Sequence, residues 1–221
     1  MGAISASIGR VQEVVKELEE DIVLGRIYPR ERLVEEQLAE RFNIKRHVVR
    51  QALLELETSG LVVRSAGKGV VVVEYSAEEV DELYTLRGML ETEAARMIPY
   101  PVDDNEMAKI EALSLKYAEA VERLDMQMVI RANKQFHETI YALCNNRFLT
   151  MTINRMAQRS NLVRFSSSTD AAHLVRARDE HFAIVTALKS SNRDELAALC
   201  VAHLQPSRKH YVERIRRIKG I

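Results

Sequence analysis

The chain has little glycine, proline and cysteine, and it lacks any long hydrophobic segment. Its 8 Gly and 4 Pro supply few turn-forming residues for 221 positions, so the composition favours helices over sheets. The two cysteines, Cys144 and Cys200, are too few for a disulfide framework, which fits a reducing compartment. No run of about 18 apolar residues is present, and the first residues lack the pattern of a secretory signal. We therefore expect a cytoplasmic protein without a membrane partner.

Charge of one sign is not in excess, because 32 basic residues balance 32 acidic ones. Nucleic-acid-binding proteins often have a basic excess, so this total counts weakly against that class. The distribution of charge is more informative. Residues 41–54 contain Arg41, Lys45, Arg46 and Arg50 and no acidic residue. Such a concentration of positive charge is expected where one element of a protein contacts phosphates.

The first 75 residues change from helical to strand-like periodicity. The expected helices cover residues 8–25, 33–42 and 45–58, and the expected strands cover residues 61–64 and 70–73. Asn43 follows the second helix, where its tolerance of the left-handed conformation favours a tight break. This order of three helices and a hairpin is typical of a winged helix-turn-helix, with the basic cluster on the third helix.

The pattern after residue 75 is helical only. Ser76 and Glu79 have the spacing of a capping box, which begins a helix predicted to end near Ile98. Further helices are predicted over residues 103–122, 126–144, 147–165, 171–190 and 193–217, with a serine-rich break at 166–170. Short connections favour antiparallel neighbours. The prediction is a mainly α protein, in which a winged helix-turn-helix domain (residues 1–75) precedes an antiparallel all-α helical bundle (residues 76–221).

Three histidines lie where a helical bundle needs apolar residues. Asn133 and His137 share the inward face of the helix at 126–144, and His181 and His203 keep step with apolar residues of later helices. A buried imidazole needs a partner, and neutral imidazole is a good ligand for zinc, nickel, copper or iron. One such histidine is more often a satisfied core residue, but three with an amide oxygen favour a metal site. A hydrogen-bonded histidine cluster is the alternative.

Short motifs in both halves resemble one known family. The N-terminal motifs are residues 29–33, 37–40, 45–53, 56–57, 60–62 and 67–69, and they resemble the DNA-binding domain of the GntR family of bacterial regulators. The C-terminal motifs are residues 83–87, 90–91, 136–137, 180–181 and 203–204, and they resemble the metal-binding branch of the FadR-type (FCD) effector domain. The resemblance covers nearly the whole chain. It implies a DNA-binding transcription regulator and not an enzyme.

The resemblance makes the third helix the recognition helix. The expected contacts to double-stranded DNA come from Lys45, Arg46, His47 and Arg50 of this helix and from Gly67, Lys68 and Gly69 at the hairpin tip. Arg46 and Arg50 lie four residues apart and therefore project from one face, from which arginine can bind guanine by two hydrogen bonds. Such domains act in pairs, which implies a homodimer on a near-palindromic operator. A solvated helix face is the alternative interpretation of the basic cluster.

The resemblance also implies a sensing site in the second half. Its metal ligands would be Asn133, His137, His181 and His203, for a divalent transition metal such as zinc or nickel. The family normally has aspartate where this chain has Asn133. Arg87 would bind the carboxylate of a small organic acid effector, because a guanidinium can clamp a carboxylate by two bonds. An ion pair between helices is the alternative role for Arg87.

These expectations together describe a ligand-responsive repressor in which an effector shifts the population between two arrangements. A metal-only sensor is one alternative. A metal-dependent hydrolase is less favoured, because Glu138 and Glu180 neighbour two of the histidines and should point away from the site, about 100° around their helices. The sequence also contains neither an HExxH motif nor a phosphate-binding glycine loop.

Overall fold

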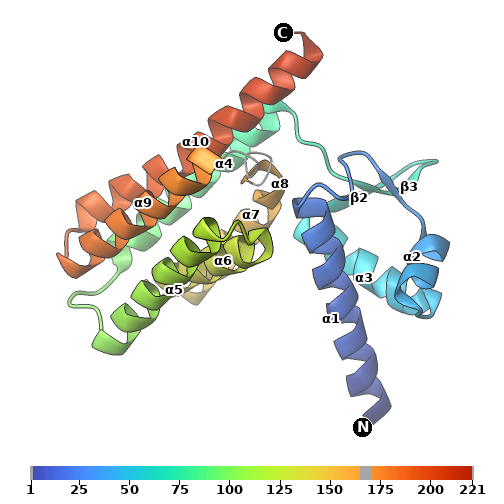
Figure 1. Ribbon diagram of the computed structural model, residues 1–221, viewed down its shortest axis with the longest axis horizontal. Helices are drawn as coiled ribbons and strands as arrows, with labels where there is room; N and C mark the ends of the chain where they lie inside the picture. Colours follow the sequence, from blue (N-terminus) through green and yellow to red (C-terminus); the bar gives the residue numbers. More distant parts are fainter. Residues whose placement is uncertain (1, 165–170, 221) are drawn as a thin grey trace. The chain divides into compact units, whose positions relative to one another are not determined.

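The computed structural model describes residues 2–164 and 171–220 (Figure 1). The serine-rich break expected at residues 166–170 lies outside the described residues. The chain divides into two compact units, residues 1–75 and residues 76–221. No helix in the described part of the chain is both long enough and apolar enough to cross a membrane.

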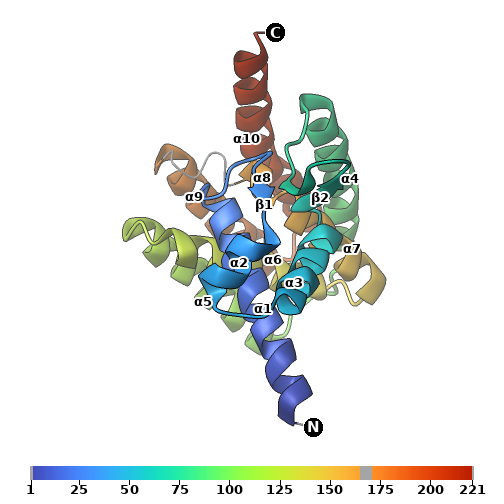
Figure 2. The same ribbon diagram turned by 90° about the vertical axis from the view of Figure 1, so that its right-hand side faces the viewer.

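The N-terminal unit combines three helices with a small antiparallel sheet. The helices are α1 (Gly2–Val23), α2 (Glu35–Phe42) and α3 (Arg46–Ser59), and the strands are β1 (Arg32–Leu33), β2 (Val62–Ser65) and β3 (Gly69–Val72). The strand order is β1-β3-β2. In Figure 2, α1 runs beside α3 within this unit. The expected winged helix-turn-helix and the mainly α fold class are confirmed.

Strand β1 is the main local difference between this unit and the sequence-based expectation. Leu33 was assigned to the second helix, but it forms β1 and pairs with Val70 of β3, so α2 begins only at Glu35. A strand of two residues is too short to leave a periodic signal, and its formation depends on the free edge of β3. The expected left-handed break after α2 is confirmed, because Asn43 has a φ of 50°.

The C-terminal unit consists of helices alone in the part that the structure describes. They are α4 (Ala77–Met97), α5 (Asp104–Glu122), α6 (Met126–Ala142), α7 (Arg147–Arg159), α8 (Asn161–Arg164), α9 (Ala171–Lys189) and α10 (Arg193–Lys219). In Figure 1, α4 and α10 run side by side, and α5 packs against α6 and α9. The capping box that begins α4 is confirmed, because both reciprocal bonds between Ser76 and Glu79 are present.

The helix expected over residues 147–165 is divided in two. It is interrupted at Ser160, whose hydroxyl donates to the carbonyl of Ala157 and accepts a hydrogen bond from Arg87 of α4. These tertiary and local bonds have no signature in helical periodicity. By contrast, Pro206 lies inside α10 without ending it, although proline removes one helical hydrogen bond.

The core of the helical unit surrounds the inward faces of α4, α6, α9 and α10. Its largest fully buried members include Phe136 and Ile140 of α6. The predicted inward face of α6 is confirmed at the positions of Val129, Asn133 and His137, all of which are buried. Polar groups therefore enter a core that is otherwise apolar, and they need partners there.

Candidate metal centre and nucleic-acid interface

The three inward histidines meet inside the helical unit. His137 comes from α6, His181 from α9 and His203 from α10, and their candidate ligand atoms all lie within 4.8 Å of one another. The distances between ring centroids are 5.2 Å for His137–His181 and 5.0 Å for each of the other two pairs. Three helices far apart in sequence therefore bring three imidazoles to one point.

Several nitrogens in this cluster have no hydrogen-bond partner among the described residues. They are Nε2 of His137, both ring nitrogens of His181 and Nδ2 of Asn133, all of them buried. A buried polar group without a partner costs about 1–3 kcal/mol. A hydrogen-bonded histidine cluster, the alternative interpretation, would need partners for these nitrogens of His137 and His181. Imidazole nitrogens that lie within 4.8 Å of one another and lack such partners suit a bound divalent metal, so the residues fit such an ion.

The local environment keeps two of these imidazoles in the form that binds metals. Burial lowers the pKa of His137 well below its ordinary value, and His203, His181 and Arg164 lower it further. Burial also lowers the pKa of His181 well below its ordinary value, with added contributions from His203 and Arg164. The neutral imidazole carries the lone pair that a metal requires.

Glu180 contacts the third histidine, contrary to the sequence-based expectation. Its Oε2 lies 2.7 Å from Nδ1 of His203, although Glu180 was expected to point away from the site. That expectation considered only the helix that carries Glu180, whereas its side chain reaches His203 on the neighbouring helix α10. A carboxylate on Nδ1 fixes the orientation of the ring and leaves Nε2 as the nitrogen for a metal. Glu138, the other flanking carboxylate, lies 3.9 Å from Lys134 instead.

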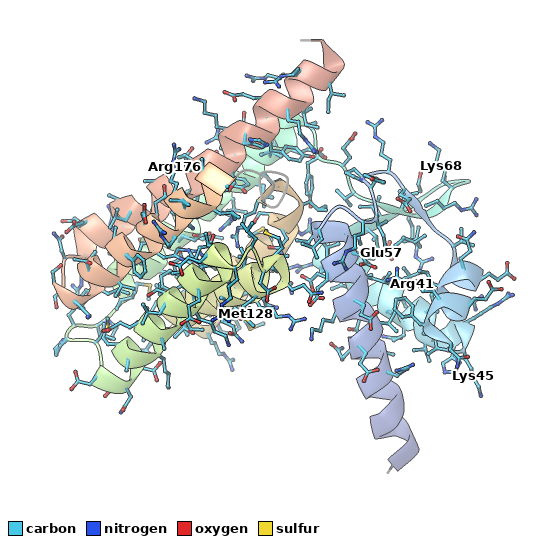
Figure 3. All side chains as sticks on the ribbon, in the orientation of Figure 1. Arg41, Lys45, Glu57, Lys68, Met128 and Arg176 are labelled. Atoms are coloured by element: carbon cyan, nitrogen blue, oxygen red, sulfur yellow. The ribbon has the colours of Figure 1, made fainter. Side chains whose placement is uncertain are left out.

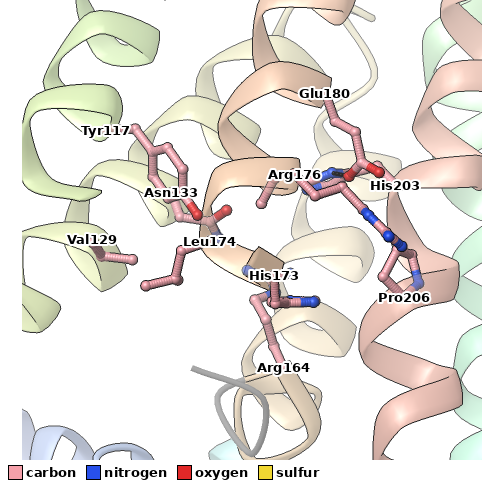
Figure 4. A pocket seen from close by; sticks show the side chains of 11 residues that line it. Tyr117, Val129, Asn133, Arg164, His173, Leu174, Arg176, Glu180, His203 and Pro206 are labelled. Atoms are coloured by element: carbon pink, nitrogen blue, oxygen red, sulfur yellow. Dashed lines mark hydrogen bonds and ion pairs between the residues drawn. The ribbon is translucent and has the colours of Figure 1, made fainter. Parts of the chain in front are cut away.

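Asn133 supplies the fourth candidate ligand, one helical turn before His137. Its side chain is buried, and it lines a pocket together with His203 (Figure 4). An amide oxygen is a neutral donor, as is each imidazole. The set of four candidate ligands therefore carries no negative charge with which to balance a divalent ion.

Two pockets adjoin the histidine cluster. The first is lined by Asn133, His203 and Pro206 among others. The second is lined by His137, Arg87 and other residues of α6 and α7. The cavity volumes are about 30 and 20 Å³, enough for one or two water molecules each. Arg164, the last residue of α8, lines both pockets.

Arg87 is engaged within the protein. Its guanidinium forms an ion pair of 2.7 Å with Glu91, one turn later on α4, and donates a hydrogen bond of 2.8 Å to Ser160. Tyr141 donates a further hydrogen bond of 2.6 Å to Glu91. The pair lies within one helix, whereas the alternative considered from the sequence was a pair between helices. The four-residue spacing of Arg87 and Glu91 was a signal that could have indicated it.

Arg164 was not identified from the sequence. It lies at the end of a four-residue helix, where periodicity carries little information. Burial and the nearby Arg87 lower the pKa of Arg164, and Arg164 in turn contributes to the lowered pKa of His137 and His181. The guanidinium therefore lies close enough to the histidine cluster to act on it electrostatically.

The expected DNA-reading residues lie on exposed parts of the N-terminal unit. Exposed positions include Lys45, Arg46, His47 and Arg50 at the start of α3, and Gly67, Lys68 and Gly69 at the turn between β2 and β3. Figure 3 shows Lys45 and Lys68 with their side chains directed outward. Gly67 and Gly69 have φ values of 75° and 76°, a conformation that glycine adopts without strain.

Two of these arginines are paired with acidic residues of α2. Arg46 forms an ion pair with Glu36, and Arg50 forms one of 2.7 Å with Glu35. Both guanidinium groups remain more than half exposed. Exposed pairs of this kind contribute little stability, so a stronger anion could displace the carboxylates.

Comparisons with known proteins agree with this division of the chain. The family model "Bacterial regulatory proteins, gntR family" matches residues 10–72, and the "FCD domain" model matches residues 82–206. The chain is 29% identical to the Nta operon transcriptional regulator of Aminobacter aminovorans over 192 residues, which cover 87% of this chain and 88% of that protein. It is 24% identical to the HTH-type transcriptional repressor RspR of Escherichia coli (strain K12), over 88% of this chain and 85% of that protein.

Solved structures show the same fold. The structure of E. coli McbR/YncC aligns with a TM-score of 0.80 and 22% identity, covering 93% of this chain and 98% of that chain. At this identity the likeness establishes the architecture, and the roles of individual residues depend on their own geometry.

Proposed function

Because the chain belongs to the GntR family of bacterial regulatory proteins and carries an FCD domain, we propose that it is a repressor whose DNA binding responds to a metal and a small carboxylic acid. The chain is a DNA-binding transcription regulator and not an enzyme. The finer proposal concerns its operator, its metal and its effector. A bacterial operator lies in the cytoplasm, so the proposal places the chain there.

The DNA-binding half of the proposal rests on the exposed start of α3. Arg46 and Arg50 lie on one face of this helix, and a major groove admits a helix whose first residues contact base edges. DNA phosphates and guanine acceptors would replace Glu36 and Glu35 as partners of the two guanidinium groups. Lys45, His47 and the tip around Lys68 would contact phosphates. A homodimer would place two such helices on a near-palindromic operator.

The sensing half rests on one observation, the unpartnered buried nitrogens of His137 and His181. His137, His181 and His203, with the amide oxygen of Asn133, would hold a divalent transition metal, zinc or nickel being the favoured choices. When bound, the metal would act as a Lewis acid that accepts a carboxylate oxygen. The protein itself orients His203 through Glu180 and keeps water out of the cluster by burial.

The response would pass through α4, whose N-cap Ser76 directly follows the N-terminal unit. Arg87 of α4 lines the second pocket, and Glu91 is its ion-pair partner. A ligand in that pocket would therefore favour one arrangement of α4 over another. Only a difference in affinity between two arrangements can shift their populations. Repression is proposed by analogy with the relative that is named a transcriptional repressor.

A metal-only sensor is the second candidate function, and one observation favours it. Arg87 already has Glu91 and Ser160 as partners, so this arginine is less available to an organic acid than the sequence suggested. In such a sensor, metal alone would change operator affinity.

The test begins with the full-length protein and a random double-stranded DNA library. We expect selection to recover a near-palindromic site, bound with steep salt dependence. Native mass spectrometry of the purified protein should give a dimer with one metal ion per subunit, and replacing both His137 and His203 with alanine should remove that metal. A monomer that selects no sequence would contradict the DNA-binding half, and metal retained by the double variant would contradict the ligand assignment.

A further inference from the structure

Two exposed cations of the N-terminal unit lie at the wing without an acidic partner. The wing is the hairpin of residues 62–72, and β1 pairs along one edge of it. Arg32 of β1 and Lys68 of the turn form no ion pair and no side-chain hydrogen bond with any described residue. By contrast, Glu57 holds Arg64 of β2 at 3.0 Å. Arg32 and Lys68 can therefore bind an anion without first breaking an ion pair.

The register of the sheet places Arg32 on the solvent-facing side of the wing. Arg32 pairs with Val71, and Leu33 pairs with Val70. Successive residues of a strand point to opposite faces of a sheet. Leu33 and Val70 are buried, so Arg32 and Val71 lie on the opposite face. Val63 pairs with Val71 on that face and is 46% exposed.

The guanidinium of Arg32 extends toward the tip of the wing over a glycine. A Cβ atom added to Gly69 would lie 3.7 Å from Nε and 3.9 Å from Nη2 of Arg32. Gly69 is the first residue of β3, directly after Lys68. Because glycine has no side chain, the guanidinium can lie close to the backbone where the turn ends. The tip of the wing therefore includes an arginine that belongs to a strand distant in sequence.

The wing follows the expected recognition helix directly. Helix α3 ends at Ser59, β2 begins at Val62, and the two elements contact each other. A helix in the major groove has a minor groove on each side of it, which a hairpin leaving that helix can reach. The minor groove of A·T tracts is narrow, and its strong negative potential attracts arginine. Arginine is also more weakly hydrated than lysine, so it gives up its water at a lower cost.

We propose that Arg32 is a specificity-determining residue that enters the minor groove beside each half-site and makes the protein prefer A·T-rich flanks. The exposed face of Val63 and Val71 suits this role, because proteins of the minor groove combine basic with apolar side chains. Lys68 stays a phosphate contact. The inference rests on the proposed placement of α3 in the major groove and adds a residue, a groove and a sequence preference.

The test uses the full-length protein and the operator recovered by selection, with constant half-sites and varied flanks. The flanks contain A·T, G·C, inosine·C or 2,6-diaminopurine·T pairs. Inosine lacks the minor-groove amino group of guanine, and diaminopurine adds that group to adenine, so only the minor-groove edge changes. We expect the wild type to bind A·T and inosine·C flanks about tenfold more tightly than the other two, the size of one base-pair effect. Fluorescence anisotropy measures these affinities.

The variants separate Arg32 from the other cations of the wing. Arg32→Ala should bind all flanks with the affinity that the wild type has for G·C flanks. Arg32→Lys keeps the charge but should lose most of the preference, because an ammonium group is strongly hydrated. Lys68→Ala should weaken binding to every flank equally and reduce the salt slope by about one. Arg64→Ala is the matched control and should keep the preference, because Arg64 pairs with Val70 on the opposite face.

Several outcomes would overturn the inference while leaving α3 in the major groove. One is a wild type that binds all flanks alike, or that treats inosine·C as G·C. Another is an Arg32→Ala variant that keeps the wild-type ratio between flanks, as a phosphate contact or a structural role would give. Circular dichroism checks the fold of each variant. Selection that recovers no near-palindromic site would overturn the proposed operator contacts and this inference with them.

Discussion

The guanidinium of Arg87 and the carboxylate of Glu91 form a buried ion pair of 2.7 Å, one turn apart on α4. Tyr141 of α6 donates to the same carboxylate at 2.6 Å, and Arg87 donates to Ser160 at the end of α7 at 2.8 Å. The pair therefore connects α4 with α6, which carries His137, and with the junction of α7 and α8. A ligand that moved α6, or the junction of α7 and α8, would act on α4 through these bonds.

Removing one member of this pair should be more damaging than removing both. Arg87→Met leaves a buried carboxylate without its cation, which should lower the free energy of unfolding by about 3–5 kcal/mol. The double variant Arg87→Met with Glu91→Met leaves no buried charge and should lose less. Urea denaturation of the metal-free protein measures both changes. An Arg87→Met variant as stable as the wild type, but without an acid response, would instead support the effector role first assigned to Arg87.

We expect His181 to lower the stability of the metal-free protein, because its side chain serves to bind a metal. Its side chain is fully buried, and neither ring nitrogen has a described partner. The centroid of its ring lies 4.2 Å from the centroid of the Phe136 ring. His181→Leu removes the unpartnered polar atoms, so the metal-free protein should gain about 1 kcal/mol of stability. Added Zn²⁺ should no longer raise the unfolding temperature. The control is His210→Leu on α10, outside the cluster.

A less stable metal-free His181→Leu protein would contradict this prediction. It would mean that the imidazole contributes to the fold through its packing on Phe136 and Tyr117, whose ring lies 4.5 Å away. Unfolding measured with and without a chelator separates these outcomes. A chelator lowers the stability of the wild type only if the protein binds a metal.

Periodicity in the sequence was sufficient for much of the fold and for the cluster. His137, His181 and His203 each follow the apolar spacing of a helix, so their burial could be predicted before their meeting point was known. The left-handed residue Asn43 was predictable from its side chain. Strand β1 was not, because two residues leave no pattern and Leu33 is strand only through its pairing with Val70.

Contacts between helices account for what the sequence could not indicate. Glu180 was placed away from the site by the angle around its own helix, yet it reaches His203 on α10. Arg164 ends a helix of four residues, and its position between two pockets depends on how α8 packs. The reach of Glu180 and the position of Arg164 both depend on how neighbouring helices pack, and this packing is not a property of local sequence.

DNA affinity should depend on two arginines of α3. Arg46→Ala or Arg50→Ala should each weaken binding to the selected operator by about 1–3 kcal/mol, the value of one good contact to a base. Lys16→Ala, at an exposed lysine of α1, should leave affinity unchanged. Fluorescence anisotropy with labelled operator measures these changes, and circular dichroism checks the fold. Equal affinity of both arginine variants and the wild type would contradict the placement of the recognition helix.

The acidic partners of these arginines should act in the opposite direction. Glu36→Gln removes the carboxylate that pairs with Arg46, so DNA no longer has to displace it. Operator affinity should therefore increase, most clearly at low salt, where charge interactions are least screened. A decrease in affinity would indicate that Glu36 orients Arg46 for DNA and does not compete with it.

Two glutamates that each neighbour a cluster histidine in sequence should differ sharply in their effect on the metal. Glu180 contacts Nδ1 of His203 at 2.7 Å, whereas Glu138 follows His137 but lies 3.9 Å from Lys134. A carboxylate on the far nitrogen of a ligand histidine orients the ring and strengthens the ligand, and its loss typically costs about 10–100-fold in metal affinity. Glu180→Gln should therefore weaken Zn²⁺ binding by about tenfold or more, while Glu138→Gln should leave it unchanged. Competition with a chromogenic chelator measures both. Equal Zn²⁺ affinities of the two variants would mean that Glu180 does not orient His203. The His203 ring would then present Nδ1 to the cluster, or neither of its nitrogens.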